Sequence, residues 1–117
     1  MKSQRHIERE YKKLLHDVAT KDFYKIDLSH RVNCYTCQNG HVTKTIERDA
    51  GVTPMFIACP ICPAMSSSSM YQAIDADIIE TREWFRPSLK ECIKMRGKNE
   101  AMLDHILMGG LEIRRII

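Results

Sequence analysis

The first twenty residues place apolar and charged positions with the period of an α-helix. Apolar residues recur three, four and seven positions apart, so that one face of a helix would carry Ile7, Tyr11, Leu14, Leu15 and Val18. Ser3 stands where a helix N-cap is expected, and the opposite face mixes positive and negative charges. The pattern predicts an amphipathic helix over residues 3–20 with a solvated charged face.

The middle of the chain is rich in residues that favour β-strands. β-Branched residues concentrate at 42–46, a turn signal follows at 49–51, and a short apolar run occupies 55–58. We expect strands at both runs and a third strand through residues 70–74. Three acidic residues that follow are interpreted as a solvated linker: Asp75, Asp77 and Glu80.

The last third of the chain returns to helical periodicity. Ser88 and Glu91 have the spacing of a capping box, and Gly97 is expected to end this first short helix. Asn99 can cap a second helix, which Gly109 would end. The inward positions of the two helices are Leu89, Cys92, Ile93, Met102, Leu103, Ile106 and Leu107. Residues 88–108 are therefore predicted to form a helical pair.

The composition is that of a globular domain, with 44 % hydrophobic and 28 % charged residues. The 117 residues suffice for one domain with a small core, which a metal ion or a partner subunit can stabilise. No apolar run approaches the roughly 20 residues that span a bilayer, and the charged N-terminus shows no secretory signal. We expect a single domain over residues 1–117 in a reducing cytoplasm, where cysteines serve as metal ligands or free thiols.

Four of the five cysteines form two CxxC motifs separated by 21 residues. Zn²⁺ prefers a tetrahedron of four ligands, and two such motifs joined by a β-hairpin bring four thiolates together. A shell of four thiolates leaves no position for water, which is typical of structural sites. The spacing predicts a zinc ribbon over residues 30–74 with one structural Zn²⁺ per chain, held by Cys34, Cys37, Cys59 and Cys62. The formal net charge of +3 would then fall by two.

Other interpretations of the cysteines and their neighbours stay open. Four thiolates also suit an iron–sulfur cluster, and CxxC pairs occur as redox motifs. His30 and His41 flank the first motif and can replace a cysteine, although we favour His41 as the start of a strand. Cys92 is interpreted as a small buried hydrophobe. Because no phosphate loop, HExxH or GxSxG motif is present, we expect no catalytic residues and no enzymatic activity.

A segment with neighbouring aromatic and basic residues is a candidate for partner binding. Side by side, a Trp and a Phe can stack on a base or anchor a protein, and the cations that follow suit phosphate groups. The candidate residues are Trp84, Phe85, Arg86, Lys90, Lys94 and Arg96. The alternative is that the two aromatic side chains fill the core and the lysines are merely solvated.

Several short motifs, taken in their order, resemble a group of small zinc-ribbon proteins encoded by tailed bacteriophages. The matching segments span roughly residues 30–116: 51–54, Cys59 and Cys62, 68–71, 83–87, 103–105, 109–111 and Arg114. The resemblance implies a zinc ribbon, a phage origin and a location in the cytoplasm of the host cell. It implies no activity, since these proteins have no function that we can state.

The expected fold is small α+β, with a zinc-ribbon β-sheet flanked by an N-terminal helix and two short C-terminal helices. The leading functional hypothesis is a non-enzymatic binding module that engages a host protein or nucleic acid and that can be a homo-oligomer. The alternatives are a counter-defence factor that sequesters a small anionic, nucleotide-like ligand, and a virion accessory protein.

Overall fold

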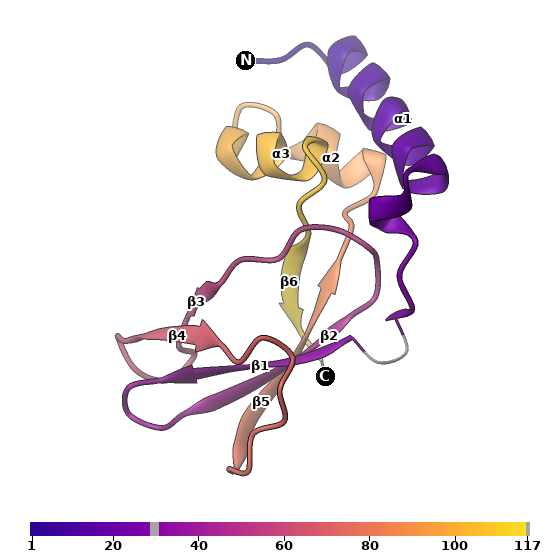
Figure 1. Cartoon of the computed structure of the whole chain (residues 1–117). Helices are drawn as coiled ribbons and strands as arrows, with labels where there is room; N and C mark the ends of the chain where they lie inside the picture. The colour runs from indigo at the N-terminus through magenta and orange to yellow at the C-terminus, as the bar shows by residue number, and fades with distance from the viewer. Residues whose placement is uncertain (29–30, 117) are drawn as a thin grey trace. The chain divides into compact units, whose positions relative to one another are not determined.

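The computed structural model describes residues 1–28 and 31–116, and it confirms the small α+β fold (Figure 1). Two compact units divide the chain, one helical and one built on a β-sheet. The helical unit comprises Met1–Ile26, Asp49–Val52 and Phe85–Glu112; the sheet unit comprises Asp27–Arg48, Thr53–Trp84 and Ile113–Ile117. No helix in the described part of the chain is long and apolar enough to cross a membrane.

Three α-helices form the helical unit, at the positions that their periodicity and caps predict. They are α1 (Gln4–Thr20), α2 (Leu89–Met95) and α3 (Glu100–Leu107), with the short 3₁₀ helix η1 (Asp22–Tyr24) after α1. Ser3, Ser88 and Asn99 cap the three α-helices, and Ser88 forms the predicted capping box with Glu91. The apolar faces meet in one core: Ile7, Tyr11, Cys92, Leu103 and Ile106.

Two buried polar contacts hold the connecting segments of the helical unit in place. The Tyr11 hydroxyl donates to the backbone carbonyl of Pro87 at 2.7 Å. The Arg86 side chain, only 6 % exposed, donates to the carbonyl of Ala50 and pairs with the Asp49 carboxylate at 3.5 Å. A buried guanidinium is costly unless it is paired in this way, so segment 49–52 is fixed to the chain that leads into α2.

Six strands form the sheet: β1 (Val32–Cys37), β2 (Val42–Glu47), β3 (Phe56–Ala58), β4 (Met65–Ser68), β5 (Ile78–Phe85) and β6 (Glu112–Arg115). Their order across the sheet is β3-β4-β1-β2-β5-β6, so β3 and β6 are the edges. Strand β2 runs antiparallel to β1 and parallel to β5. The strands expected at 42–46 and 55–58 correspond to β2 and β3.

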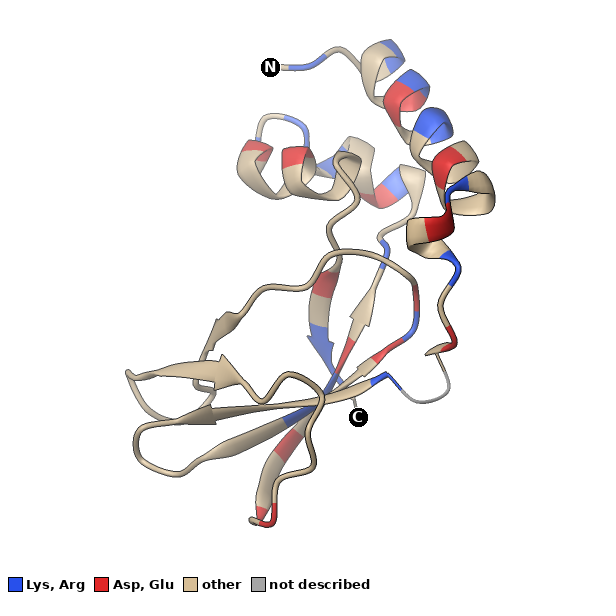
Figure 2. Cartoon of the chain, in the orientation of Figure 1, with Lys and Arg blue, Asp and Glu red and all other residues tan. Residues whose placement is uncertain are grey.

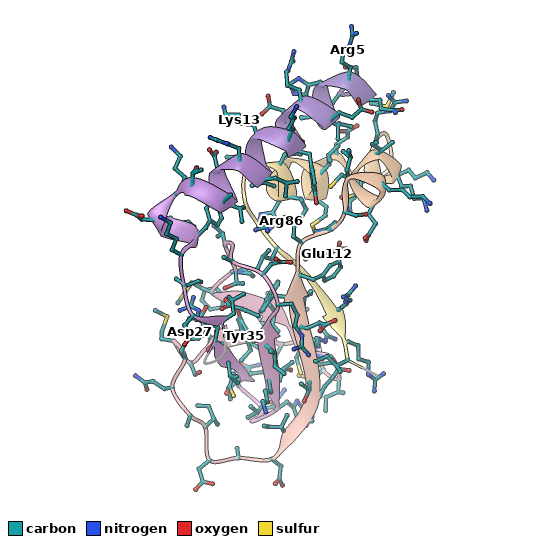
Figure 3. All side chains as sticks on the ribbon, turned by 90° about the vertical axis from the view of Figure 1, so that its right-hand side faces the viewer. Arg5, Lys13, Asp27, Tyr35, Arg86 and Glu112 are labelled. Atoms are coloured by element: carbon teal, nitrogen blue, oxygen red, sulfur yellow. The ribbon has the colours of Figure 1, made fainter. Side chains whose placement is uncertain are left out.

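Polar side chains fill much of the buried face of the sheet. Tyr35 lies fully buried within the sheet (Figure 3), and its neighbours on this face include Asn33, Thr43, Thr45 and Glu47. Glu47 is 4 % exposed and accepts hydrogen bonds from Arg31 at 2.7 Å and from the Tyr71 hydroxyl at 2.8 Å. The buried carboxylate is thus both paired and hydrogen-bonded, as its desolvation requires.

The strand expected at 70–74 is wrong, because a tight turn occupies residues 70–71 and residues 72–74 have no regular structure. Met70 and Tyr71 have positive φ angles of 56° and 66°, which no strand allows. The side chain of Asn33 accepts from the backbone N–H of Tyr71 at 3.0 Å, and the Tyr71 ring stacks on Arg31 at 4.0 Å. These tertiary contacts offset the cost of two left-handed residues, about 1–3 kcal/mol each. The strand lies instead in the serine run, as β4.

Strand β5 begins within the acidic run that the sequence predicts to be a solvated linker, and ion pairs stabilise this strand. Glu83 accepts from Arg48 and from Arg114, each at 2.7 Å, which holds the pKa of its carboxyl below the usual range. Glu80 pairs with Arg82 and with Arg115. Two of these arginines, Arg114 and Arg115, lie on β6, so the pairs link the last strand to β5.

Trp84 is 3 % exposed and lies 6.4 Å from Tyr35 between ring centroids, so its side chain is part of the sheet core. We predict that Trp84→Ala lowers the free energy of unfolding by about 3–5 kcal/mol, because it leaves a large cavity. Urea denaturation measures the loss, and Trp84→Phe should cost clearly less. An unchanged midpoint for Trp84→Ala would contradict this packing.

Candidate metal centre

The turn between β1 and β2 brings the first two donor side chains together. Strand β1 ends at Cys37, and the chain reverses through Asn39 and Gly40, whose φ of +82° favours glycine. Backbone hydrogen bonds join Cys37 N–H to the His41 carbonyl at 3.1 Å and Gly40 N–H to the Cys37 carbonyl at 2.9 Å. Residues paired across such a hairpin project to the same face, so Cys37 and His41 are neighbours.

The loop between β3 and β4 supplies the other two donors. Cys59 directly follows β3, and a backbone hydrogen bond from its N–H to the Ala64 carbonyl closes the loop at 3.0 Å. Cys62 lies within this loop, and its Sγ atom is 3.8 Å from the Sγ atom of Cys37. The loop and the hairpin turn therefore meet through their sulfur atoms.

The four donor atoms have the spacing of a single tetrahedral metal site. Cys37, His41, Cys59 and Cys62 offer one atom each, and these atoms all lie within 4.8 Å of one another. The Nδ1 atom of His41 is 3.4 Å from Cys37 Sγ and 3.6 Å from Cys59 Sγ. Around an ion the size of zinc, neighbouring donors are about 3.8 Å apart for two sulfurs and about 3.6 Å for sulfur and nitrogen. The group can hold a metal ion.

Cys34 lies apart from this group, for a reason of strand geometry. The first CxxC motif does not form a turn but continues as strand β1, in which successive side chains alternate between faces. Cys34 and Cys37, three positions apart, therefore project to opposite faces. Cys34 is 8 % exposed and pairs in register with Lys44. The structure brings together three of the four predicted cysteines, and Cys34 as a ligand stays a prediction.

His41 is the donor that the sequence interpretation set aside as the start of a strand. The sequence signal for it is Gly40 at the end of a three-residue hairpin loop, Gln38 to Gly40, which pairs Cys37 with His41. The other flanking histidine, His30, lies outside the described residues.

Hydrogen bonding and burial shift the pKa values of two of the thiols in opposite directions. The Asn39 side-chain amide donates to Cys62 Sγ at 3.4 Å, and together with the backbone N–H of Ala64 it lowers the pKa of Cys62 to about 6. Burial raises the pKa of Cys59, although the backbone N–H of Ile61 opposes this effect. Such donors are the usual surroundings of metal-bound thiolates.

The number and spacing of the donor atoms restrict the kinds of site that they can form. Four protein donors close a tetrahedral shell, which is typical of structural sites. The distance of 3.8 Å between Cys37 and Cys62 is far too long for a disulfide bond. A cluster of several iron ions needs its ligands farther apart than one ion does, so the tight spacing favours a mononuclear site.

The candidate partner-binding residues are divided between buried and exposed positions. Trp84 is buried in the sheet unit, and the Arg86 side chain is engaged with Asp49 in the helical unit. Phe85 and Arg96 are half-buried, whereas Lys90 and Lys94 are exposed on α2. A partner-binding role stays a prediction, and Lys90 and Lys94 are the candidate cations that a partner could reach.

Cys92 is fully buried, and burial raises the pKa of its thiol to about 11, as suits a small core residue.

We predict that Asn39→Ala weakens metal binding by about 10–100-fold, the usual loss for a hydrogen-bond partner of a ligand. The Cys62 thiol then loses the donor that favours its thiolate, so the deficit should be larger at neutral than at alkaline pH. Competition with a chromophoric chelator measures both effects. Gln38→Ala, an exposed neighbour in the same turn, is the matched control; equal affinities of the two variants would contradict the role of Asn39.

Comparison of this chain with known protein families, curated proteins and solved structures finds no match. The function is therefore argued from the site itself.

Proposed function

We propose that this protein is a non-enzymatic zinc-binding module in which Cys37, His41, Cys59 and Cys62 hold one structural Zn²⁺. The observation that carries the proposal is the convergence of four donor atoms within 4.8 Å from two separate segments of the chain. Thiolate and imidazole donors in a tetrahedron suit zinc, whereas magnesium and calcium prefer oxygen donors.

A structural role follows from the arrangement of the ligands. Catalytic zinc keeps an open position for water, and here four protein donors fill the shell. The ion would join the β1–β2 turn to the β3–β4 loop, two short segments with little apolar surface of their own to bury. Metal binding then contributes directly to the folding of this half of the sheet.

The test compares single-ligand variants by native mass spectrometry. The wild-type chain should carry one zinc, whereas Cys59→Ser and His41→Ala should lose it. Cys34→Ser is the matched control, because Cys34 is equally buried but faces away from the site. Circular dichroism of each variant separates loss of metal from loss of fold.

The outcomes distinguish two ligand assignments, three cysteines with one histidine and four cysteines. Zinc retained by Cys34→Ser and lost by His41→Ala supports the set of three cysteines and one histidine. The reverse pattern supports four cysteine ligands, with β1 rearranged around Cys34. Full zinc retention by Cys59→Ser would refute both assignments.

We further propose that the exposed lysines of α2 engage an anionic partner, a nucleic acid or an acidic protein surface. Lys90 and Lys94 are one helical turn apart and both are exposed, so they present two cations on one face. The resemblance of residues 30–116 to phage zinc-ribbon proteins supports a phage-encoded module with a partner in the host.

For nucleic acid, affinity should fall linearly with log salt, and Lys90→Ala/Lys94→Ala should reduce the slope by about two. Fluorescence anisotropy with a labelled oligonucleotide over a salt series measures the slope. Lys21→Ala, at the end of α1, should leave it unchanged. An identical slope for the double variant would exclude α2 as the contact surface.

A further inference from the structure

A long stretch of the chain around the metal centre carries no charge. Residues 50–74 contain no Asp, Glu, Lys or Arg, in a chain of which 28 % is charged. Residues 32–43, which form β1 and the β1–β2 turn, also contain none of these residues. Figure 2 shows the result in the sheet unit: β3, β4 and the β1–β2 turn lack charged residues, whereas β5 and β6 carry many.

Large apolar side chains are exposed on this uncharged part of the sheet. Phe56 on β3 is 59 % exposed, and Met65 on β4 is 56 % exposed. The register pairs Phe56 with Ser67 and Ala58 with Met65, so Phe56, Ala58 and Met65 share the outward face of the β3–β4 pair. Three further exposed apolar residues belong to the same uncharged segment of the chain: Met55, Ile61 and Met70. We call Phe56, Ala58 and Met65 the β3–β4 patch.

The edge of β3 adds backbone groups to this patch. Strand β3 ends the sheet, and β4 is its neighbour among the described strands. The hydrogen bonds from Ser68 N–H to the Met55 carbonyl and from Cys59 N–H to the Ala64 carbonyl fix the ladder alternation. The N–H and C=O groups of Phe56 and Ala58 consequently point away from β4, where another strand can pair with them.

The chemistry of the β3–β4 patch excludes several classes of partner. A nucleic acid needs cations for its phosphates, and a membrane-surface site needs cations for the lipid headgroups. The patch has none. Methionine and phenylalanine in the absence of charge are instead the composition of a protein–protein interface.

The absence of charge favours a second copy of the same chain over a different protein. In a two-fold interface each residue near the axis faces its own counterpart, so any charge there meets a like charge. A different partner would be free to use complementary charges for recognition and orientation. We propose that the β3–β4 patch is the interface of a homodimer in which two β3 edges pair antiparallel across a two-fold axis. None of the residues of the patch is a proposed metal ligand, so the inference goes beyond the proposed function.

The test introduces a charge into the patch and measures the mass of the assembly. Sedimentation equilibrium of the metal-loaded wild-type chain should give a dimer. Met65→Glu should weaken the dimer by about tenfold or more, equivalent to at least about 1.4 kcal/mol. Met108→Glu is the matched control, because Met108 is 84 % exposed at the end of α3 and lies outside the patch. It should dimerise as the wild type does.

A charge-swap experiment tests the two-fold arrangement itself. Phe56→Glu and Phe56→Lys should each be monomeric alone, because two like charges would lie close together across the axis. An equimolar mixture of the two should recover a dimer, since opposite charges then meet. Native mass spectrometry identifies the mixed dimer and reports the zinc content of every species, which separates a failure of the interface from a failure of the metal site.

Three results would overturn the proposal. The first is a wild-type chain that carries its metal and remains monomeric at high micromolar concentration. The second is a Met65→Glu variant that dimerises as tightly as Met108→Glu. The third is a mixture of the two Phe56 variants that stays monomeric with full zinc content.

Discussion

The register of the β1–β2 hairpin is the constraint on which the rest of the sheet unit depends. If the pairing register of a strand shifts by two residues, each side chain stays on the same face of the sheet. A shift by one residue moves every side chain to the opposite face. The turn through Asn39 and Gly40 sets this register by pairing Cys37 with His41. The same register places Tyr35 and Thr43 on the buried face and sends Cys34 to the other side. Which side chains converge at the candidate metal centre is thus a consequence of hairpin geometry.

The buried face of the sheet is held as much by polar contacts as by apolar packing. Glu47, Arg31 and Tyr71 bond to one another, and the side chain of Asn33 accepts from the turn that contains Tyr71. These hydrogen bonds fix a turn whose backbone is strained. Removing any one of these side chains leaves a buried polar group without its hydrogen-bond partner, which is costly. A small domain with such a polar interior buries little apolar surface on folding, so apolar packing contributes little to its stability. The proposed metal ion would join two loops and so compensate for this shortage.

Charge is distributed unevenly within the sheet unit, and the two ends of the sheet differ accordingly. At one end, Glu80 and Glu83 form ion pairs with arginines of β5, of β6 and of the segment after β2. At the other, the candidate metal centre lies among uncharged strands, and exposed methionines occur in the same segment of the chain. Charged pairs suit an edge that stays in water, because they discourage further strand pairing. The uncharged edge has no such protection, which is the physical basis for assigning it a partner.

The sequence by itself determined the features that depend on local chemistry. Helical periodicity and caps gave α1, α2 and α3 at their observed positions, and the buried state of Cys92 followed from its place on the apolar face of α2. β-Branched and apolar runs located β2 and β3, and cysteine spacing indicated a metal centre that includes Cys37, Cys59 and Cys62.

Only the tertiary structure decided the features that depend on contacts between distant segments. Strand β5 pairs parallel to β2 through a long connection, and arginines from other strands neutralise its acidic residues. The left-handed turn at Met70 and Tyr71 exists because Asn33, Arg31 and Glu47 hold it. Contacts between distant segments also decide that His41, and not Cys34, lies with Cys37, Cys59 and Cys62 in the group of converging donors. The spacing of a CxxC motif fits both a turn and a strand, and only the pairing of β1 with its neighbours selects the strand.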